Sequence, residues 1–391
     1  MPTQASERIS WKQLSPIFAD VVLSPWNLLV GGLLIQYLPP LEALASIVSG
    51  YTVLALVFIL YGGLGYKKRV QSAVIFQEIF QGSFGNIFIP LLLACGQLGW
   101  AAINIGLGGS SLAQLVHVPR AVGLIAYALA IGFLASVKLY RLAYVKGIII
   151  ASSVSLAIYI GILKIHATGF GQFLAYHPAH HKSLFWGCSV VVASLISFAT
   201  VSPDLFQNAR HKRDVTRSTI WGVVLPGIVL CALGCFFFFN RQLNLISLIG
   251  SLSVPALANI FNSVANADGS IAVYTPALKF GIIFKSPILL GIAGGTLISL
   301  VLALLKITNY LEVWLKALSI ISPVLIGVAF AAVLFDKKAF RHLPASFSKY
   351  AYGLTVVICG SLLSQAVPVI FALIAPLLIY SIYLQYRHIH E

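Results

Sequence analysis

The stretch "LSPWN", Leu23–Asn27, places a Ser-Pro pair inside a long hydrophobic run, and "VSPDL", Val201–Leu205, repeats this arrangement in the second half of the chain. Proline has no backbone N–H and clashes with the preceding helical turn, so we expect each run to form a helix that is interrupted at its Ser-Pro pair. Interrupted helices at corresponding places in two halves of a membrane protein are typical of a secondary-transporter site. Two unrelated kinks are the alternative, because proline is common in transmembrane helices.

The composition identifies lipid as the solvent of these helices. The chain has 391 residues, a mean hydropathy of +0.95, 59% hydrophobic residues and only 9% charged ones. A soluble domain of this length cannot bury so much apolar surface. About 20 apolar residues cross the hydrocarbon core as a helix, and runs of that length recur along the chain. We therefore predict an all-α polytopic membrane protein in the cytoplasmic membrane.

The hydrophobic runs predict about twelve transmembrane helices in one domain, residues 1–391. Their expected bounds are 17–38, 42–64, 86–108, 121–137, 144–164, 184–202, 217–239, 251–278, 287–305, 312–335, 350–367 and 369–386. Residues 17–164 and 184–335 each begin with a Ser-Pro-interrupted run and contain an odd number of helices, so we expect a five-plus-five inverted repeat. Residues 350–386 would then form two peripheral helices.

The net charge of +15 reflects topology in this interpretation. Most of the 25 Lys and Arg residues fall in segments that are cytoplasmic if the N-terminus is inside, Lys146 and Lys279 among them. This bias predicts that both termini are cytoplasmic, and it argues against a nucleic-acid surface. The bilayer is therefore the expected partner, with no nucleic acid and no obligate protein partner.

Asp268 is the only acidic residue that falls well inside a predicted helix, in "NSVANADGSIAVY", Asn262–Tyr274. A charged side chain costs roughly 2.5–3.5 kcal/mol at the bilayer centre on insertion scales, so such residues usually have a function. Asn262, Asn266 and Ser270 follow one another at intervals of four and share a helix face. A buried carboxylate suits a coupling proton or sodium ion. The alternative is a structural hydrogen bond, or an ion pair with Lys279.

Polar groups in two other predicted helices suit a planar ligand. Gln97 and Trp100 lie three residues apart, on one face, and offer an amide that donates and accepts beside a large flat ring. Ser194 and Ser197 precede the proposed interruption of the sixth helix. Simple packing of Trp100 at a close glycine contact, and serine hydroxyls bonded within their own helix, are the alternatives.

Three patches resemble the nucleobase–cation symporter-1 family, especially its cytosine permease branch: "GQLGWAA" (Gly96–Ala102), "SLISFATVSPDLFQNAR" (Ser194–Arg210) and "AVYTPALKF" (Ala272–Phe280). The likeness extends loosely over residues 17–340. It implies a leucine-transporter-like fold and ion-coupled uptake of nucleobases or related heterocycles.

The resemblance also implies roles for individual residues. Gln97 would hydrogen-bond the base, Trp100 would stack on it, and Ser194 and Ser197 would lie beside it. The chain departs from the family at Leu195, where the cytosine permeases have an aromatic residue, so that a stacking wall is lost or supplied by Phe198.

The eighth helix departs further from the family, which has a hydroxyl pair for sodium followed by asparagines for the base. One register places Ala267 and Asp268 at the hydroxyl pair, and the other places Asn262 and Ser263 there. Both registers remain open, and both disfavour ordinary sodium coupling and cytosine itself.

Together these features predict a secondary active transporter that imports a small planar nitrogen heterocycle with H+ or Na+ by alternating access. The predicted substrate-binding residues are Gln97, Trp100, Ser194, Ser197, Asn27, Asn266 and Ser270. The predicted coupling-ion residues are Asp268, Ser24 and Ser263. We expect no cofactor, no metal site and no catalytic residue.

Three rival functions fit the sequence less well. An amino-acid transporter of the same fold would favour more glycine at the first interruption than "SPWN" offers. A membrane enzyme would need clustered acidic, histidine or metal-binding groups, whereas the histidines are scattered. A passive channel would lack concentrative uptake. No Walker A motif supports ATP-driven transport by this chain.

Overall fold

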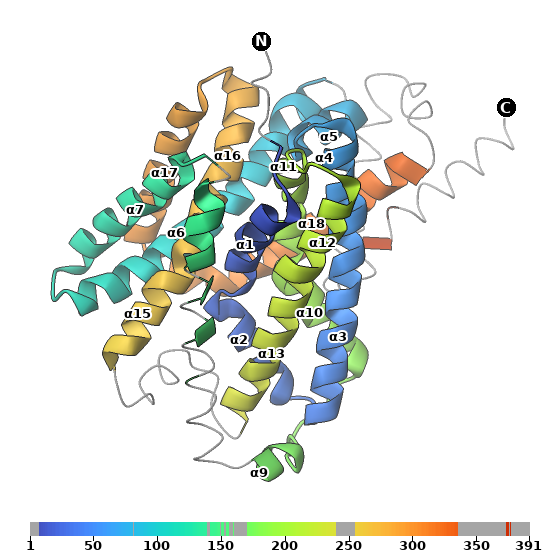
Figure 1. Cartoon of the computed structure of the whole chain (residues 1–391), viewed down its shortest axis with the longest axis vertical. Coiled ribbons are helices and arrows are strands. Elements are labelled where there is room, and N and C mark those ends of the chain that lie inside the picture. Colours follow the sequence, from blue (N-terminus) through green and yellow to red (C-terminus); the bar gives the residue numbers. More distant parts are fainter. Residues whose placement is uncertain are drawn as a thin grey trace, which may run out of the picture.

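The computed structural model describes residues 8–80, 82–138, 141–148, 170–239 and 255–334, with isolated positions in 150–159 and 373–376. These residues are almost entirely helical, and the β-structure among them is one isolated bridge between Ile9 and Ala209. The predicted all-α class is therefore confirmed (Figure 1). Most of the expected fifth span and the two peripheral helices at 350–386 lie outside the described residues.

The first half of the chain forms eight of the named α-helices, and the second half forms the others (Figure 1). In the first half they are α1 Trp11–Val22, α2 Pro25–Ile35, α3 Pro40–Val57, α4 Gly63–Lys68, α5 Ser72–Ile79, α6 Ile89–Leu115, α7 Arg120–Ser136 and α9 Phe170–Leu174. In the second half they are α10 Leu184–Ala199, α11 Ser202–Phe206, α12 Lys212–Thr219, α13 Leu225–Phe238, α15 Pro255–Ala265, α16 Gly269–Phe284, α17 Ile288–Leu304 and α18 Leu311–Leu334.

Both Ser-Pro interruptions occur where the sequence predicts them. The first membrane crossing is divided into α1 and α2, which meet at an angle of 54°. Ser24 precedes α2 in an extended conformation and Pro25 is its first residue, where a missing N–H costs no helical hydrogen bond. The predicted sixth helix is divided in the same way into α10 and α11, with Pro203 in the first turn of α11.

The predicted eighth helix is also interrupted, which is not expected from the sequence. A short 3₁₀ segment, Asn266–Asp268, separates α15 from α16. The Asn266 amide donates to the backbone carbonyl of Asn262 at 2.7 Å, so a side chain competes with the backbone for that acceptor. Short polar side chains thus interrupt this helix without proline.

Small residues allow the helices to approach closely. A Cβ atom on Gly31 of α2 would lie 1.8 Å from the carbonyl oxygen of Cys231 in α13, and one on Gly234 would lie 2.1 Å from that of Leu28. Only glycine permits this contact between α2 and α13. On the other side of the molecule, α7, α16 and α17 pack against the 27-residue helix α6.

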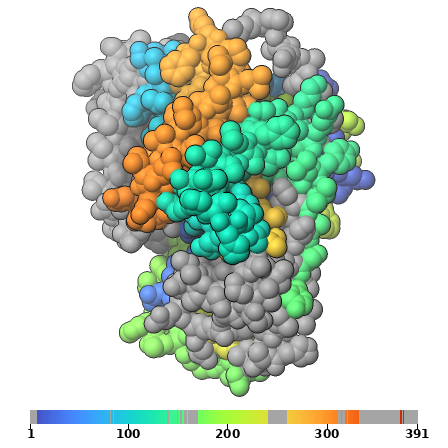
Figure 2. All heavy atoms as spheres, turned by 90° about the vertical axis from the view of Figure 1, so that its left-hand side faces the viewer, coloured from blue at the N-terminus to red at the C-terminus, as the bar shows by residue number. Residues whose placement is uncertain are grey.

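Large hydrophobic side chains cover the outside of the helices. Figure 2 shows α7 and α17 together on one face, where Leu129, Phe133, Leu290 and Leu297 are all exposed. Exposed apolar side chains on this scale fit contact with lipid. By length and composition, three continuous helices of the described part can cross a membrane: 40–68, 85–115 and 212–238. The bent pair α1 and α2 makes a fourth.

Candidate functional site

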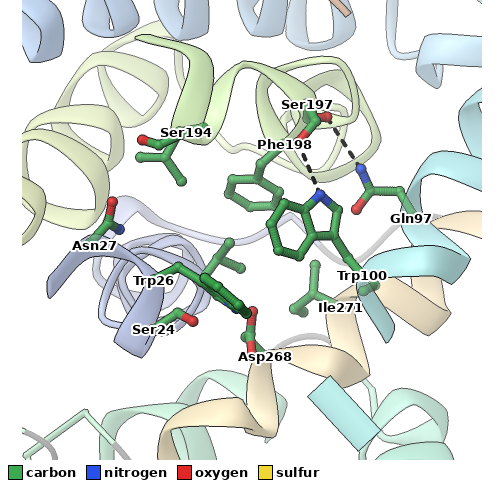
Figure 3. Close-up of a pocket in the computed structure, with 13 residues that line it drawn as sticks. Ser24, Trp26, Asn27, Gln97, Trp100, Ser194, Ser197, Phe198, Asp268 and Ile271 are labelled. Atoms are coloured by element: carbon green, nitrogen blue, oxygen red, sulfur yellow. Dashed lines mark hydrogen bonds between the residues drawn. The ribbon is translucent and has the colours of Figure 1, made fainter. Parts of the chain in front are cut away.

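A cavity lies where the interrupted first and sixth crossings face α6 and the start of α16 (Figure 3). It is lined by Val21, Ser24, Trp26, Asn27, Gln97, Trp100, Ser194, Leu195, Ser197, Phe198, Asp268, Ile271 and Ala272. Its volume of about 40 Å³ holds only a few water molecules at roughly 10–15 Å³ each, less room than a heterocyclic ring needs. A ligand of that size therefore requires side chains to move.

Hydrogen bonds from Gln97 and Trp100 to Ser197 hold α6 against α10. The Trp100 indole donates to Ser197 Oγ at 3.1 Å, and the Gln97 amide donates to the Ser197 carbonyl at 3.2 Å (Figure 3). Gln97 and Ser197 also line a second cavity toward Trp314 and Leu318 of α18. The hydrogen-bonded Gln97 and Ser197 thus lie between the two cavities. The donors to Ser197, Gln97 and Trp100, are also the groups predicted to bind substrate.

Trp26 is a cavity residue that the sequence analysis did not select, although it lies in the "SPWN" stretch. Its ring packs against the Trp100 ring with centroids 6.0 Å apart and an interplanar angle of 64°. Its buried Nε1 has no hydrogen-bond partner among the described residues. The signal in the sequence was a bulky aromatic residue directly after the helix-interrupting Pro25.

Asn27, Ser24 and Ser194 all line the cavity, but they differ in how their polar atoms are engaged. The Asn27 amide donates to the Val22 carbonyl across the interruption and accepts from the Tyr51 hydroxyl at 3.2 Å. The Ser194 hydroxyl donates to a carbonyl of its own helix at 2.7 Å. Of these three residues, only Ser24 has its buried polar side-chain atom without a hydrogen-bond partner among the described residues.

Asp268 lies at the end of the 3₁₀ segment and points toward the cavity (Figure 3). It is 8% exposed, and its Oδ1 has no hydrogen-bond partner within the described part of the chain. The adjacent Gly269 lets α6 approach, because a Cβ there would lie 3.1 Å from the Cβ of Asn104. The Asn104 amide is likewise buried without a described partner. An unsatisfied carboxylate is costly to bury, so this position suits a proton or an incoming ligand.

The alternative that Lys279 pairs with Asp268 is wrong, and neither Lys146 nor Lys279 is a solvated loop residue. Both ammonium groups are fully buried. Lys279 pairs with Asp204 of α11, and Lys146 pairs with Asp20 of α1. Each lysine pairs with an acidic residue near a Ser-Pro interruption, and this pairing offsets the cost of burying both charges inside the protein.

Asn266, Ser270 and Ser263, also selected from the sequence, do not line the cavity. Asn266 donates to Asn262, and the Ser270 hydroxyl donates to the Ala267 carbonyl at 3.0 Å. The Ser263 hydroxyl donates to a carbonyl of α6 at 3.2 Å. These groups shape the interruption of the eighth crossing and attach it to its neighbours, so the geometry offers no support for direct contact with a ligand.

Phe198 takes the position of the aromatic wall that Leu195 does not provide. Both residues line the cavity, and the Phe198 ring is held by edge-on contacts with Phe18 at 5.7 Å and tilted contacts with Phe58 at 5.8 Å between centroids. This ring adds an apolar surface to the lining of the cavity.

Comparison with solved structures places this fold among known transporters. Mhp1, a nucleobase-cation-symport-1 family transporter in a closed conformation with bromovinylhydantoin bound, has a TM-score of 0.79 at 13% identity over 98% of this chain and 94% of that chain. Inward-facing Mhp1 gives 0.77 at 14% identity over 99% and 93%. A substrate-bound, outward-open Na+-coupled sialic acid symporter gives 0.72 at 15% identity over 96% and 88%.

These likenesses confirm the fold that the three sequence patches imply. The architecture is that of leucine-transporter-like membrane transporters, and Mhp1 is among the structures that it resembles. No protein-family model matches the chain, and no curated protein matches its sequence. At 13–15% identity, the property that these likenesses show is the fold alone.

Proposed function

We propose that this protein is a secondary active transporter that imports a nucleobase or a related small planar nitrogen heterocycle across the cytoplasmic membrane. The observation that carries the proposal is a set of unpartnered polar atoms around one cavity: the Trp26 indole N–H, the Ser24 hydroxyl and Asp268 Oδ1. Buried polar groups normally have partners, so these three are suited to a ligand that both donates and accepts. A nitrogen heterocycle carries such groups on its ring edge.

The aromatic residues support a flat substrate. Trp26 and Trp100 each present an indole to the cavity, and Phe198 provides a further apolar surface. Stacking of a base on an aromatic ring contributes about 1–3 kcal/mol. Gln97 adds an amide beside them, which becomes available once it releases the Ser197 carbonyl. Mhp1, which shares the fold, has bromovinylhydantoin bound in its closed conformation, and that ligand is a heterocycle.

In this proposal Asp268 carries the coupling ion, which we take to be a proton. Its carboxyl lies at a helix interruption and borders the same cavity as the aromatic residues. Protonation removes the cost of burying its unpartnered charge, so substrate and proton can be occluded together. Inward and outward conformations would alternate around this site, with both chain termini in the cytoplasm.

Amino-acid transport is the second candidate. The Asp268 carboxylate suits an ammonium group, and the amides at the start of α2 suit a carboxylate. Pro25 removes one of those amides, however, and the two indoles favour a flat ring. An enzymatic role has no support in the cavity, which lacks a paired nucleophile and base.

Uptake into proteoliposomes tests the proposal with uracil, cytosine, hydantoin, pyrimidine vitamin precursors and L-phenylalanine, each under an imposed pH gradient. Asp268→Asn should abolish accumulation against a gradient while counterflow exchange persists, because the neutral amide mimics the protonated acid. Glu42→Gln changes a partly exposed carboxylate on α3 that does not line the cavity and lies 2.9 Å from His181 Nε2, and it serves as the control. Unchanged concentrative uptake in the Asp268 variant would refute its coupling role.

Trp26→Ala tests the substrate site separately from coupling. We expect the binding free energy of the accumulated heterocycle to weaken by roughly 1–3 kcal/mol, a loss of affinity of about 5- to 150-fold, with Trp26→Phe recovering part of the loss. Binding is measured by substrate-induced thermal stabilisation of purified protein. Preference for L-phenylalanine over every heterocycle would instead favour the second candidate.

A further inference from the structure

Lys146 is a buried charge that the proposed transport site does not use. Residues 141–148 are helical, and the Lys146 side chain is fully buried. Its ammonium ion-pairs with Asp20 of α1, and it donates to the backbone carbonyl of Ala267 at 2.7 Å. One amine therefore joins the interrupted first crossing to the interruption of the eighth.

Lys146 donates to two oxygen atoms, one from the charged Asp20 carboxylate and one from the neutral Ala267 carbonyl. Asp20 is 2% exposed and lies just before the first interruption. The Ala267 carbonyl lies in the 3₁₀ segment and also accepts from Ser270, which orients it. A buried carboxylate beside a carbonyl is the donor set that hard cations such as sodium prefer. Here an ammonium already fills that position.

Neither proposed register of the eighth helix leaves a hydroxyl pair available for sodium. Ala267 has no hydroxyl, and its neighbour Asp268 lines the cavity. Asn262 donates to Ser111 Oγ at 2.7 Å, and Ser263 donates to the Gly108 carbonyl at 3.2 Å, so both are engaged with α6. The remaining titratable groups that act on Asp20 and Asp268 here are Lys146 itself and Tyr127 of α7.

We infer that the Lys146 ammonium is a built-in cation that links the first and eighth crossings in place of a bound sodium ion. Transport is then independent of sodium. For uptake, this inference rests on the proposed function, but the cation site itself is measurable without any substrate. Lys146 is a positioning residue in this scheme, since it acts through Asp20 and Ala267.

Sodium-induced stabilisation of the purified full chain tests the site directly. Thermal unfolding is compared in sodium, potassium and choline chloride at equal ionic strength. We expect no sodium-specific rise in Tm for the wild type. A saturable sodium-specific rise would overturn the inference. Because no heterocycle is present, this result is independent of whether the proposed substrate class is right.

Variants locate the effect. Lys146→Ala removes the ammonium and leaves the Asp20 carboxylate and the Ala267 carbonyl, so we expect it to acquire a sodium-specific rise in Tm. Lys279→Ala is the matched control, since it breaks the other buried Lys–Asp pair, away from the cavity. Lys146→Arg keeps the charge and should remain insensitive to sodium. A folded Lys146→Ala that responds to sodium no more than Lys279→Ala would overturn the assignment, as would sodium stabilisation of Lys146→Arg.

Uptake of uracil or hydantoin under a pH gradient supplies the second readout. Replacing sodium by choline should leave wild-type uptake unchanged, whereas a coupled sodium ion would change it by at least about fivefold. A strict sodium requirement overturns the inference but leaves heterocycle transport standing. If no heterocycle is taken up at all, the proposed function fails and the sodium-stabilisation measurement still decides the role of Lys146.

Discussion

The two buried Lys–Asp pairs differ in how completely their charges are satisfied. Asp204 accepts from Lys279 at one oxygen and, at the other, from both the backbone N–H and the hydroxyl of Ser72 at 2.8 Å. It lies in α11, beyond the second interruption, and ties α5 and α16 to it. Asp20 is bound by Lys146, which also donates to the Ala267 carbonyl. Lys279 likewise donates to a carbonyl, that of Thr275 at 3.2 Å, so the two pairs differ at the carboxylate and not at the lysine.

This difference separates a structural cluster from a functional one. The Asp204 cluster engages both carboxylate oxygens, and neither it nor the group of Asp20, Lys146 and Ala267 lines the cavity between α1 and α6 directly. The Lys146 cluster, formed by Lys146, Asp20 and Ala267, reaches the cavity through Ala267, which directly precedes Asp268 in the chain. The Oδ1 atom of Asp268 lacks a hydrogen-bond partner among the described residues. Unsatisfied polar atoms are expensive in a membrane interior and are expected where a ligand or proton binds.

The largest expected effect on stability comes from Lys279→Ala. Removing one partner of a buried pair leaves the Asp204 carboxylate without its counter-charge, which costs about 3–5 kcal/mol in the free energy of unfolding. Equilibrium unfolding in mild detergent measures this loss. The double variant Asp204→Asn with Lys279→Gln should recover most of it, because no charge is then left unpaired. A cost below about 1 kcal/mol would mean that the cluster is not structural.

Ser72→Ala should have a smaller effect on the same cluster. It removes the hydroxyl donor to Asp204 but leaves the Ser72 backbone N–H in place. A hydrogen bond to a charged group contributes about 1.5–3 kcal/mol, so the free energy of unfolding should fall by that amount. Transport per folded molecule should stay as in the wild type. A variant that folds normally but loses transport would contradict the structural role of this cluster.

Much of the fold was predictable because proline acts locally. The Ser-Pro pairs at Ser24 and Ser202 predict both interruptions, and the structure places the helix ends beside them. The interruption at Asn266–Asp268 depends instead on a side-chain hydrogen bond within a polar segment that resembles an ordinary helix face in sequence. Its physical signal was the succession of asparagine, aspartate and glycine.

The site was predictable to the extent that its residues carry unusual chemistry for a membrane. Gln97, Trp100 and Asp268 were selected on that basis, and the structure brings them to one cavity. The partners of Lys146 and Lys279 were not predictable, because Asp20 and Asp204 lie 126 and 75 positions away in the chain. A hydropathy scale treats both lysines as solvated charges, because it contains no information on the carboxylates with which they pair.

Ser270→Ala is expected to lower the free energy of unfolding least among these variants. The Ser270 hydroxyl donates to a neutral acceptor, the Ala267 carbonyl, which keeps its hydrogen bond from Lys146 after the substitution. The loss should therefore be about 0.5–1.5 kcal/mol in the free energy of unfolding, less than for Ser72→Ala, whose acceptor is a carboxylate. Both serines are fully buried, so burial does not distinguish them. If Ser270→Ala lost more stability than Ser72→Ala, the 3₁₀ segment Asn266–Asp268 would be more tightly constrained than the Asp204 cluster. In that case the orientation of the Ala267 carbonyl would control the position of the Lys146 ammonium.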